Sequence, residues 1–230
     1  MKINILEFAE GARKAKGLTV IIDVFRAFSV GCYAYDAGAA AIIATGTVDE
    51  AFVQKVKYRN SVLVGERDER KIEGFDFGNS PTEILMADLK GMTVIHTTTA
   101  GTNGLISAEK ADIVLTGSFV NAGAVVRYIK SVDPGEVTLV AMGYRGEESA
   151  EEDLLCTEII ANRLTGANDD FSEKISALRD TSGNRFFNKE NIGFSPPSDF
   201  FLCTMADRFD FVLKAIKRYD GNINLMKIDI

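Results

Sequence analysis

The chain has 230 residues, a formal net charge of −7 at pH 7 and a sequence pI near 4.9. Nucleic-acid-binding proteins carry basic faces, so this acidic balance argues against a nucleic-acid partner. Apolar residues make up 46% of the chain and the mean hydropathy is +0.03, which indicates a globular protein with a sizeable core. No apolar run approaches the roughly 18 residues of a membrane-spanning helix, and the N-terminus lacks the layout of a secretory signal. We therefore expect a cytoplasmic protein without a membrane partner.

Short β-branched runs alternate with amphipathic segments along the chain. The strand-like runs are residues 18–22, 41–43, 61–64, 93–95, 112–115 and 137–140, and residues 209–213 indicate a late strand of open direction. This alternation is typical of βαβ units, so we predict one α/β domain over residues 1–230, a three-layer α/β/α fold with a mainly parallel or mixed sheet. Residues 166–200 are polar and Phe-bearing, with Pro196-Pro197, and are expected to form a helical insertion or cap over the sheet.

An acid and an arginine follow the first predicted strand. Asp23 comes directly after residues 18–22, and Arg26 lies within the next turn. Ligands of open α/β sheets collect beyond the carboxyl ends of the strands. A carboxylate there can bind Mg²⁺ or accept a proton, and an arginine offers a planar fork for phosphate or sulfonate oxygens. The alternative is that Asp23 only caps the helix expected over residues 25–35.

A charged, glycine-containing loop follows the strand at residues 61–64. Glu66 and Arg67 stand at its start, where they would project into the same crevice. The loop ends at Asn79 and Ser80, with Ser80 as the expected N-cap and Pro81 as the first residue of a helix. Free N–H groups at such a helix start can hold an anion. A well-capped βα connection with solvated charges is the alternative.

A threonine-rich loop follows the strand at residues 93–95. Its hydroxyls and its small residue suit an oxyanion nest, formed by Thr97, Thr98, Thr99, Gly101 and Thr102. The Gly-Lys-Ser/Thr step of a nucleotide P-loop is absent. Ser118 repeats the theme after residues 112–115, where a simple capping turn is the alternative. His96 is the only histidine, which excludes a two-histidine metal site and more often indicates a structural residue than an acid or base.

An acidic segment opens the helix expected over residues 151–164. Adjacent helical residues point in different directions, so Glu151, Glu152 and Asp153 cannot all face one ion. The apolar stripe of this helix puts Glu152 on its inward side, with Asp153 at the edge. Acids in a first turn also complement the helix dipole, which is the alternative role.

Four segments in this order and spacing are similar to motifs of one family. Residues 65–81 resemble the long central motif of the 2-phosphosulfolactate phosphatase family, the ComB proteins of coenzyme M biosynthesis. Residues 20–27, 97–102 and 152–156 resemble the family's first strand and turn, its threonine-rich loop and its acidic helix start. The resemblance covers most of residues 18 to about 215. It implies a magnesium-dependent phosphatase that releases phosphate from 2-phospho-3-sulfolactate.

Other phosphatase chemistries lack their motifs here. No cysteine is followed by an arginine six residues later, Arg-His-Gly is absent, and residues 23–26 lack the second Asp of a phosphoaspartyl motif. Metal-assisted attack by water remains. We expect Asp23, Arg26, Glu66 and Arg67 to be catalytic. The expected Mg²⁺ ligands are Asp23, Glu66, Glu152 and Asp153. The expected substrate contacts are Asn79, Ser80, Thr97, Thr98, Thr99, Gly101, Thr102 and Ser118.

Several features leave alternatives open. Phe28-Ser29 stands where many relatives carry Thr-rich residues, and the loop at residues 66–74 is unusually charged, so the substrate remains open. A non-catalytic protein that binds an anionic metabolite is the alternative function. The three cysteines are odd in number and widely spaced, which indicates reduced residues. Cys32 and Cys203 are expected in the core, whereas Cys156 follows the acidic helix start near the predicted site. A homodimer is the base-rate expectation for the assembly.

Overall fold

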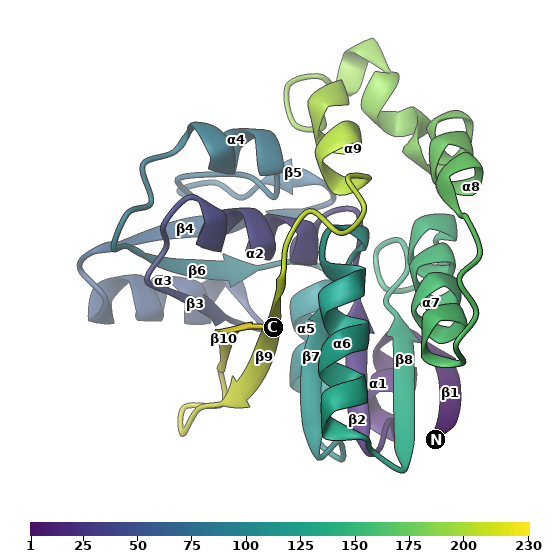
Figure 1. Cartoon of the computed structure of the whole chain (residues 1–230). Helices are drawn as coiled ribbons and strands as arrows, with labels where there is room; N and C mark the ends of the chain where they lie inside the picture. Colours follow the sequence, from purple (N-terminus) through teal and green to yellow (C-terminus); the bar gives the residue numbers. More distant parts are fainter.

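A computed structural model describes all 230 residues and contains one mixed ten-stranded sheet, in the order β1-β8-β2-β7-β9-β10-β3-β6-β4-β5 (Figure 1). The strands are β1 (Lys2–Glu7), β2 (Leu18–Ile22), β3 (Ala41–Ala44), β4 (Ser61–Arg67), β5 (Arg70–Lys71), β6 (Thr93–Thr97), β7 (Ile113–Gly117), β8 (Glu136–Ala141), β9 (Phe211–Lys217) and β10 (Ile223–Asp229).

The helices lie between these strands and in the segment that follows β8. They are α1 (Phe8–Lys14), α2 (Ala27–Asp36), α3 (Val48–Lys57), α4 (Pro81–Met86), α5 (Gly101–Ser107), α6 (Ala122–Val132), α7 (Glu151–Leu164), α8 (Ser172–Ala177) and α9 (Pro197–Cys203). Four 3-10 helices complete the set: η1 (Phe119–Asn121), η2 (Leu178–Asp180), η3 (Ser182–Phe187) and η4 (Lys189–Asn191). None of the helices is both long and apolar enough to span a bilayer.

The sheet consists of two parallel blocks joined by an antiparallel hairpin. Strands β1, β8, β2 and β7 are parallel neighbours, and so are β3, β6 and β4. Between the blocks, β9 pairs with β7, β10 pairs with β9, and β10 pairs with β3, each antiparallel. Three antiparallel steps reverse the strand direction, so the second block runs in the opposite sense to the first along the sheet.

The carboxyl ends of strands from both blocks nevertheless lie close together. Only two residue pairs join β9 to β7 and three join β10 to β3, whereas seven join β9 to β10. Neighbouring strands twist, and such short pairings let the blocks turn relative to each other, so that β4 and β6 lie beside β7 and β8 in Figure 1 and run in a different direction from them. The residues that follow or end β2, β4, β6 and β8 therefore line one pocket.

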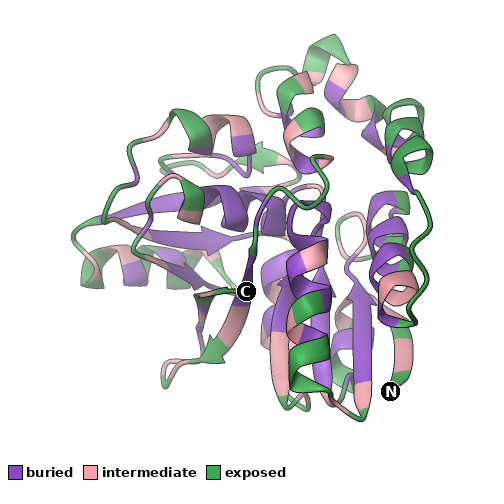
Figure 2. Ribbon diagram, in the orientation of Figure 1, coloured by how far each residue is buried: buried purple, intermediate pink, exposed green.

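Helices cover both faces of the sheet, because successive strand residues point to opposite sides. In β2, Ile21 packs into the core beneath α1, α2 and α5, whereas Val20 and Ile22 pack into the core beneath α6 and α7. Strands β2, β3, β4, β6, β7 and β8 are buried along most of their length, whereas β1 and β5 contain no buried residue (Figure 2). The prediction of an α/β fold with a mixed, mostly parallel sheet and helices on both sides is confirmed.

Local predictions agree closely with the elements. All six early strands are present, α7 spans residues 151–164, and α4 begins at Pro81 with Ser80 as its N-cap. The late strand begins at Phe211 and is antiparallel, and the sequence patterns did not indicate β1, β5 or β10. Residues 166–203, here termed the cap segment, contain only short helices and lie beyond the carboxyl ends of β2 and β8 in Figure 1.

Candidate active site

A polar pocket lies where the strand ends converge. Five of the side chains that line it are carboxylates and three are arginines, so charge dominates its chemistry. The lining residues are Asp23, Phe25, Arg26, Glu66, Glu69, Asn79, Thr99, Ala100, Gly143, Tyr144, Arg145, Glu152, Asp153 and Arg185. The residues predicted as metal ligands, Asp23, Glu66, Glu152 and Asp153, are all among them.

Asp23 lines the pocket and also contacts the start of α2, although the N-cap position of that helix belongs to Arg26. The Asp23 Oδ1 accepts the backbone N–H of Ala27 at 3.0 Å, at the first residue of α2, as a helix cap does. Its Oδ2 makes no hydrogen bond and lines the pocket. Burial raises the pKa of Asp23 to about 7, and repulsion from Glu66 and Glu152 adds to this shift. A cation in the pocket would therefore stabilise the ionised form.

Gly101 leaves room for the Asp23 carboxylate and does not line the pocket. A Cβ at position 101 would lie 2.7 Å from Asp23 Oδ2 and 2.8 Å from the Ala27 Cβ. Both contacts are closer than van der Waals packing permits, so a side chain would displace Asp23 or the start of α2.

We expect Gly101→Ala to lower the free energy of unfolding by about 1–3 kcal/mol, the usual effect of overpacking. The steric effect opposes the gain in helix propensity, which is at most about 1 kcal/mol. Urea denaturation measures the difference. Gly135→Ala is the matched control, because nothing lies within 4 Å of a Cβ there. Equal stability of the two variants would contradict this packing.

Glu66 connects the threonine-rich loop after β6 to the end of β4 by hydrogen bonds. Its Oε1 accepts the Thr99 N–H at 2.7 Å, and its Oε2 accepts the Thr99 hydroxyl at 3.2 Å and the Glu69 N–H at 2.9 Å. Both donors that Thr99 offers are thus engaged by Glu66. Glu66 shapes the pocket wall as well as lining it.

The other threonines stabilise their loop internally. Thr98 and Thr102 exchange hydrogen bonds, with the Thr98 N–H donating to Thr102 Oγ1 at 3.0 Å and the Thr102 N–H donating to Thr98 Oγ1 at 3.1 Å. Both are buried, as is Thr97, and none of the three lines the pocket. Of the predicted oxyanion nest, only Thr99 lines the pocket.

Arg67 lies outside the pocket, because β4 continues through it and adjacent strand residues point to opposite sides. Its guanidinium donates to the Glu66 carbonyl at 2.7 Å and to Thr97 Oγ1 at 3.0 Å. The Arg67 side chain therefore links β4 and β6 by hydrogen bonds.

Two buried acids reach the pocket from the first turn of α7. Asp153 accepts the Val24 N–H at 2.8 Å and the Gly143 N–H at 2.9 Å, which joins the loops after β2 and β8. Burial raises the pKa of Asp153, and the Asp23 and Glu152 charges add to the rise. Glu152 faces inward as predicted, and its Oε2 is buried without a hydrogen-bond partner. Asp153 is as buried as Glu152, whereas the sequence placed it at the edge.

The donor set fits a hard divalent cation by its chemistry. All four predicted ligands are carboxylates, which Mg²⁺ prefers. Asp23 Oδ2 and Glu152 Oε2 have no hydrogen-bond partner, whereas the oxygens of Glu66 and Asp153 accept N–H groups. No three His, Cys, Asp or Glu side chains are grouped closely enough to form a metal site by themselves. Asp23 and Glu152 are therefore the residues with free oxygens for an ion.

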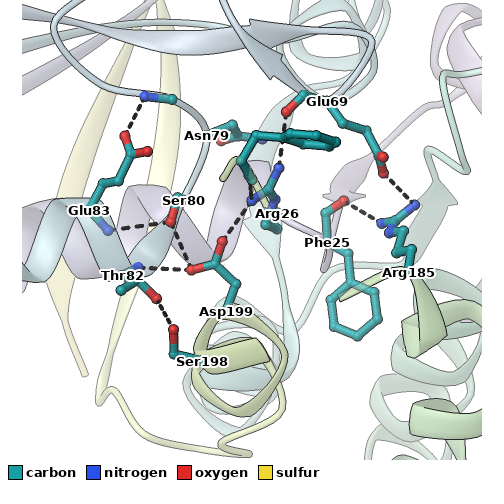
Figure 3. Close-up of polar contacts among 12 residues, drawn as sticks. Phe25, Arg26, Glu69, Asn79, Ser80, Thr82, Glu83, Arg185, Ser198 and Asp199 are labelled. Atoms are coloured by element: carbon teal, nitrogen blue, oxygen red, sulfur yellow. Dashed lines mark hydrogen bonds and ion pairs between the residues drawn. The ribbon is translucent and has the colours of Figure 1, made fainter. Parts of the chain in front are cut away.

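Arg26 and Asp199 form a buried ion pair beside the pocket (Figure 3). The Arg26 Nη1 donates to Asp199 Oδ2 at 2.6 Å and to the Phe194 carbonyl at 2.8 Å. The exposed fractions of the two side chains are 4% and 0%. Arg26 lines the pocket, but the cap segment occupies one end of its fork.

Asp199 also fills the anion position at the start of α4. Its Oδ1 accepts the Ser80 hydroxyl at 2.8 Å and the Thr82 N–H at 2.9 Å. Ser80 caps α4 as predicted, since its Oγ accepts the Glu83 N–H at 3.3 Å. The anion at this helix start is thus a carboxylate of the protein, and Ser80 does not line the pocket.

Asn79 lines the pocket and is held from behind by His96. The His96 Nε2 and the Asn79 Oδ1 are 3.1 Å apart. Burial, together with the Arg67 charge, lowers the pKa of His96 to about 4, so the imidazole is neutral at pH 7. Ser118, which bonds Ser29 at 2.6 Å between their hydroxyl oxygens, is buried away from the pocket. The three cysteines are free, as the sequence indicated, and all three are buried.

Several lining residues were not predicted. Gly143, Tyr144 and Arg145 follow β8, so the strand-end pattern that selected Asp23 would also have selected them. Glu69 lies in the charged loop after β4, and Phe25 lies between two residues that were considered. Arg185 comes from η3 in the cap segment, where no local pattern distinguishes it.

The fold and the pocket define an α/β protein with a carboxylate- and arginine-lined site at the ends of its parallel strands. Comparison with known families matches residues 5–214 to 2-phosphosulpholactate phosphatase. This chain belongs to the 2-phosphosulpholactate phosphatase family. The matched range includes all of the pocket-lining residues, among them Arg185 of the cap segment.

Similar proteins named "Probable 2-phosphosulfolactate phosphatase" occur in Caldanaerobacter subterraneus subsp. tengcongensis, Bacillus subtilis and Clostridium beijerinckii. They are 33%, 30% and 35% identical to this chain, over 85%, 90% and 73% of its length. The matched regions cover 86%, 89% and 72% of the relatives themselves.

Proposed function

We propose that the protein is a Mg²⁺-dependent phosphatase that converts 2-phospho-3-sulfolactate to 3-sulfolactate and phosphate, as part of coenzyme M biosynthesis. The family match across residues 5–214 carries the proposal. The pocket supports it, since acids from β2, β4 and α7 face arginines in one site. In the reaction, water forms a new bond to phosphorus, the bond between phosphorus and the C2 oxygen breaks, and that oxygen takes up a proton.

The cation belongs, on this proposal, at the free oxygens of Asp23 and Glu152, with Glu66 and Asp153 beside them. When bound, Mg²⁺ would supply positive charge to the phosphoryl oxygens and make a water more acidic. Burial raises the pKa of Asp23, and the Glu66 and Glu152 charges contribute to the rise, so a cation among these carboxylates would stabilise the ionised form.

The remaining pocket residues bind and orient the substrate. Arg26 lines the pocket, with its Nη1 held by Asp199 and Phe194 and its Nη2 donating to the Glu69 carbonyl at 3.4 Å, and its remaining N–H groups are assigned to phosphoryl oxygens. The side chain of Asn79, held by His96, adds a polar group at the same wall. Charge stabilisation of this kind is the largest contribution to phosphoryl transfer.

We expect phosphate release from 2-phospho-3-sulfolactate with Mg²⁺ and none with EDTA. The assay should include a panel of other phosphorylated 2-hydroxy acids, because discrimination depends on contacts away from the phosphate. If phosphate is released only from another member of the panel, the phosphatase activity is supported and the proposed substrate is replaced by that compound. Silence across the panel would favour a non-catalytic protein that binds an anionic metabolite.

A binding measurement tests the metal separately from turnover. Mg²⁺ should raise the melting temperature of the wild type, because a ligand that binds only the folded state stabilises it. Glu152→Gln should abolish this rise. Glu151→Gln is the matched control, because Glu151 is exposed on the same helical turn. A rise that persists in Glu152→Gln would remove Glu152 from the metal site.

The proposal includes a cytoplasmic location, with a small phosphorylated acid as the partner, no nucleic acid, and a homodimer as the default assembly. Three free, buried cysteines agree with a reducing compartment.

A further inference from the structure

Arg185 is the residue by which the cap segment reaches the pocket. Its Nη1 pairs with the Glu69 carboxylate at 3.0 Å, and its Nη2 donates to the Phe25 carbonyl at 3.2 Å (Figure 3). The guanidinium also lies near the Tyr144 ring, with 5.1 Å from its central carbon to the ring centre. These contacts come from three different segments of the chain, so they fix the position of the guanidinium at the pocket wall.

The hydrogen bonding of Arg185 is incomplete. Its Nε is buried without a partner, and its Nη2 lies 3.7 Å from Glu152 Oε1, too far for a hydrogen bond. The side chain is 19% exposed, which leaves it accessible from the pocket. A buried donor without a partner is unfavourable. An anionic ligand that approached this guanidinium would meet a cation whose donors the protein does not fully use.

The other two arginines of the pocket are less suited to a second anion. Arg26 is held by Asp199 at 2.6 Å, and the proposed function already assigns it to the phosphate. Arg145 is 49% exposed and pairs loosely with Asp68 at 3.4 Å, so it lies at the solvent side. Arg26 contacts the Glu69 carbonyl while Arg185 contacts the Glu69 carboxylate. The buried Arg26 and the partly exposed Arg185 thus contact different groups of Glu69, which provides two distinct positions for negative groups.

We propose that Arg185 binds an acidic group of the substrate other than its phosphate and so determines which phosphorylated acids the site accepts. This inference rests on the proposed function, since the phosphate must occupy the position beside Arg26 and the carboxylates. Carboxylate and sulfonate share the chemistry that a planar guanidinium fork recognises. The experiment separates the two.

Three phosphate esters distinguish the groups. One is 2-phospho-3-sulfolactate, one is 2-phospholactate, which lacks the sulfonate, and one is the phosphate ester of 2-hydroxyethanesulfonate, which lacks the carboxylate. We expect Arg185→Gln to lower kcat/KM roughly 10- to 100-fold for the esters that carry the contacted group. The ester without it should change less than about threefold. Arg185→Lys should restore part of the loss, because it returns the charge without the fork.

Arg179→Gln is the matched control. Arg179 belongs to the same cap segment, is exposed, and stacks on the Phe187 ring at 4.6 Å, away from the pocket. It should leave all three values of kcat/KM unchanged. An equal loss for all three esters in Arg185→Gln would overturn the proposal and reduce Arg185 to a counterion of Glu69 and Glu152.

A binding readout keeps this test apart from the proposed function. If the wild type releases phosphate from none of the esters, the proposed function fails, and thermal shifts with 3-sulfolactate then decide the role of Arg185. Stabilisation of the wild type and Arg179→Gln, but not of Arg185→Gln, would support it. Equal stabilisation of all three proteins, or of none, would overturn it.

Discussion

Asp23→Asn should remove nearly all phosphate release and leave a protein at least as stable as the wild type. The loss should reach roughly 10²- to 10⁴-fold, the range for removal of one catalytic charge. The fold should persist because Asn keeps an oxygen that can accept the Ala27 N–H, a bond of 3.0 Å in the structure. Stability should not fall, because the substitution removes a buried carboxyl that repels Glu66 and Glu152.

The pH dependence of stability tests the same residue without turnover. The pKa of Asp23 is raised by burial from its ordinary value of 3.8 to about 7, so between these values the folded state binds more protons than the unfolded state. The stability of the metal-free protein must then fall as the pH rises from about 4 to about 7. Asp153 has a pKa shifted in the same direction, so Asp23→Asn should reduce this slope without abolishing it.

Urea denaturation in EDTA across this pH range measures the slope, and a phosphate assay with Mg²⁺ measures the activity. Asp36→Asn is the control, because Asp36 is exposed at the far end of α2 and should change neither quantity. Wild-type turnover in Asp23→Asn would remove Asp23 from the catalytic set. An unchanged slope would contradict its buried, crowded environment.

Much of the site follows from local sequence, because the position of a residue at the end of a buried strand is a local property. Asp23, Glu66 and Thr99 were found in this way, and Glu152 was found from the apolar stripe of its helix. The same reasoning placed Arg67 in the pocket, because it assumed that the strand ended before Glu66. Since β4 continues through Arg67, the alternation of strand side chains turns Arg67 away.

The rest depends on contacts between distant segments. The reversed direction of the second block results from β9 and β10, which the chain supplies after residue 210. Ser80 was correctly identified as a helix cap, but the anion beside it is the carboxylate of Asp199, 119 positions later in the chain. Arg185 likewise reaches the pocket only through the packing of the cap segment. Neither pairing has a signature in the local pattern.

Asp199→Ala should cause the largest loss of stability, about 3–5 kcal/mol in the free energy of unfolding. The substitution leaves the Arg26 guanidinium buried without its 2.6 Å partner, and it removes the acceptor of the Ser80 hydroxyl and the Thr82 N–H. Asp210→Ala is the matched control, because Asp210 pairs with Arg127 at the same 2.6 Å distance but is 84% exposed. Solvent weakens such exposed pairs, so we expect no measurable change there.

A double-mutant cycle separates the contribution of this ion pair to stability from its contribution to activity in the pocket. Replacing both partners, Arg26→Met with Asp199→Leu, removes the unpaired charge, so the double variant should recover much of the stability lost in Asp199→Leu alone. Phosphate release should stay low, because Arg26 lines the pocket and the cap segment holds it there through Asp199. Urea denaturation and the phosphate assay on the wild type, Arg26→Met, Asp199→Leu and the double variant give both quantities. If turnover recovers together with stability, the ion pair contributes only to the stability of the fold. If stability recovers alone, Arg26 acts in catalysis and Asp199 is its positioning residue.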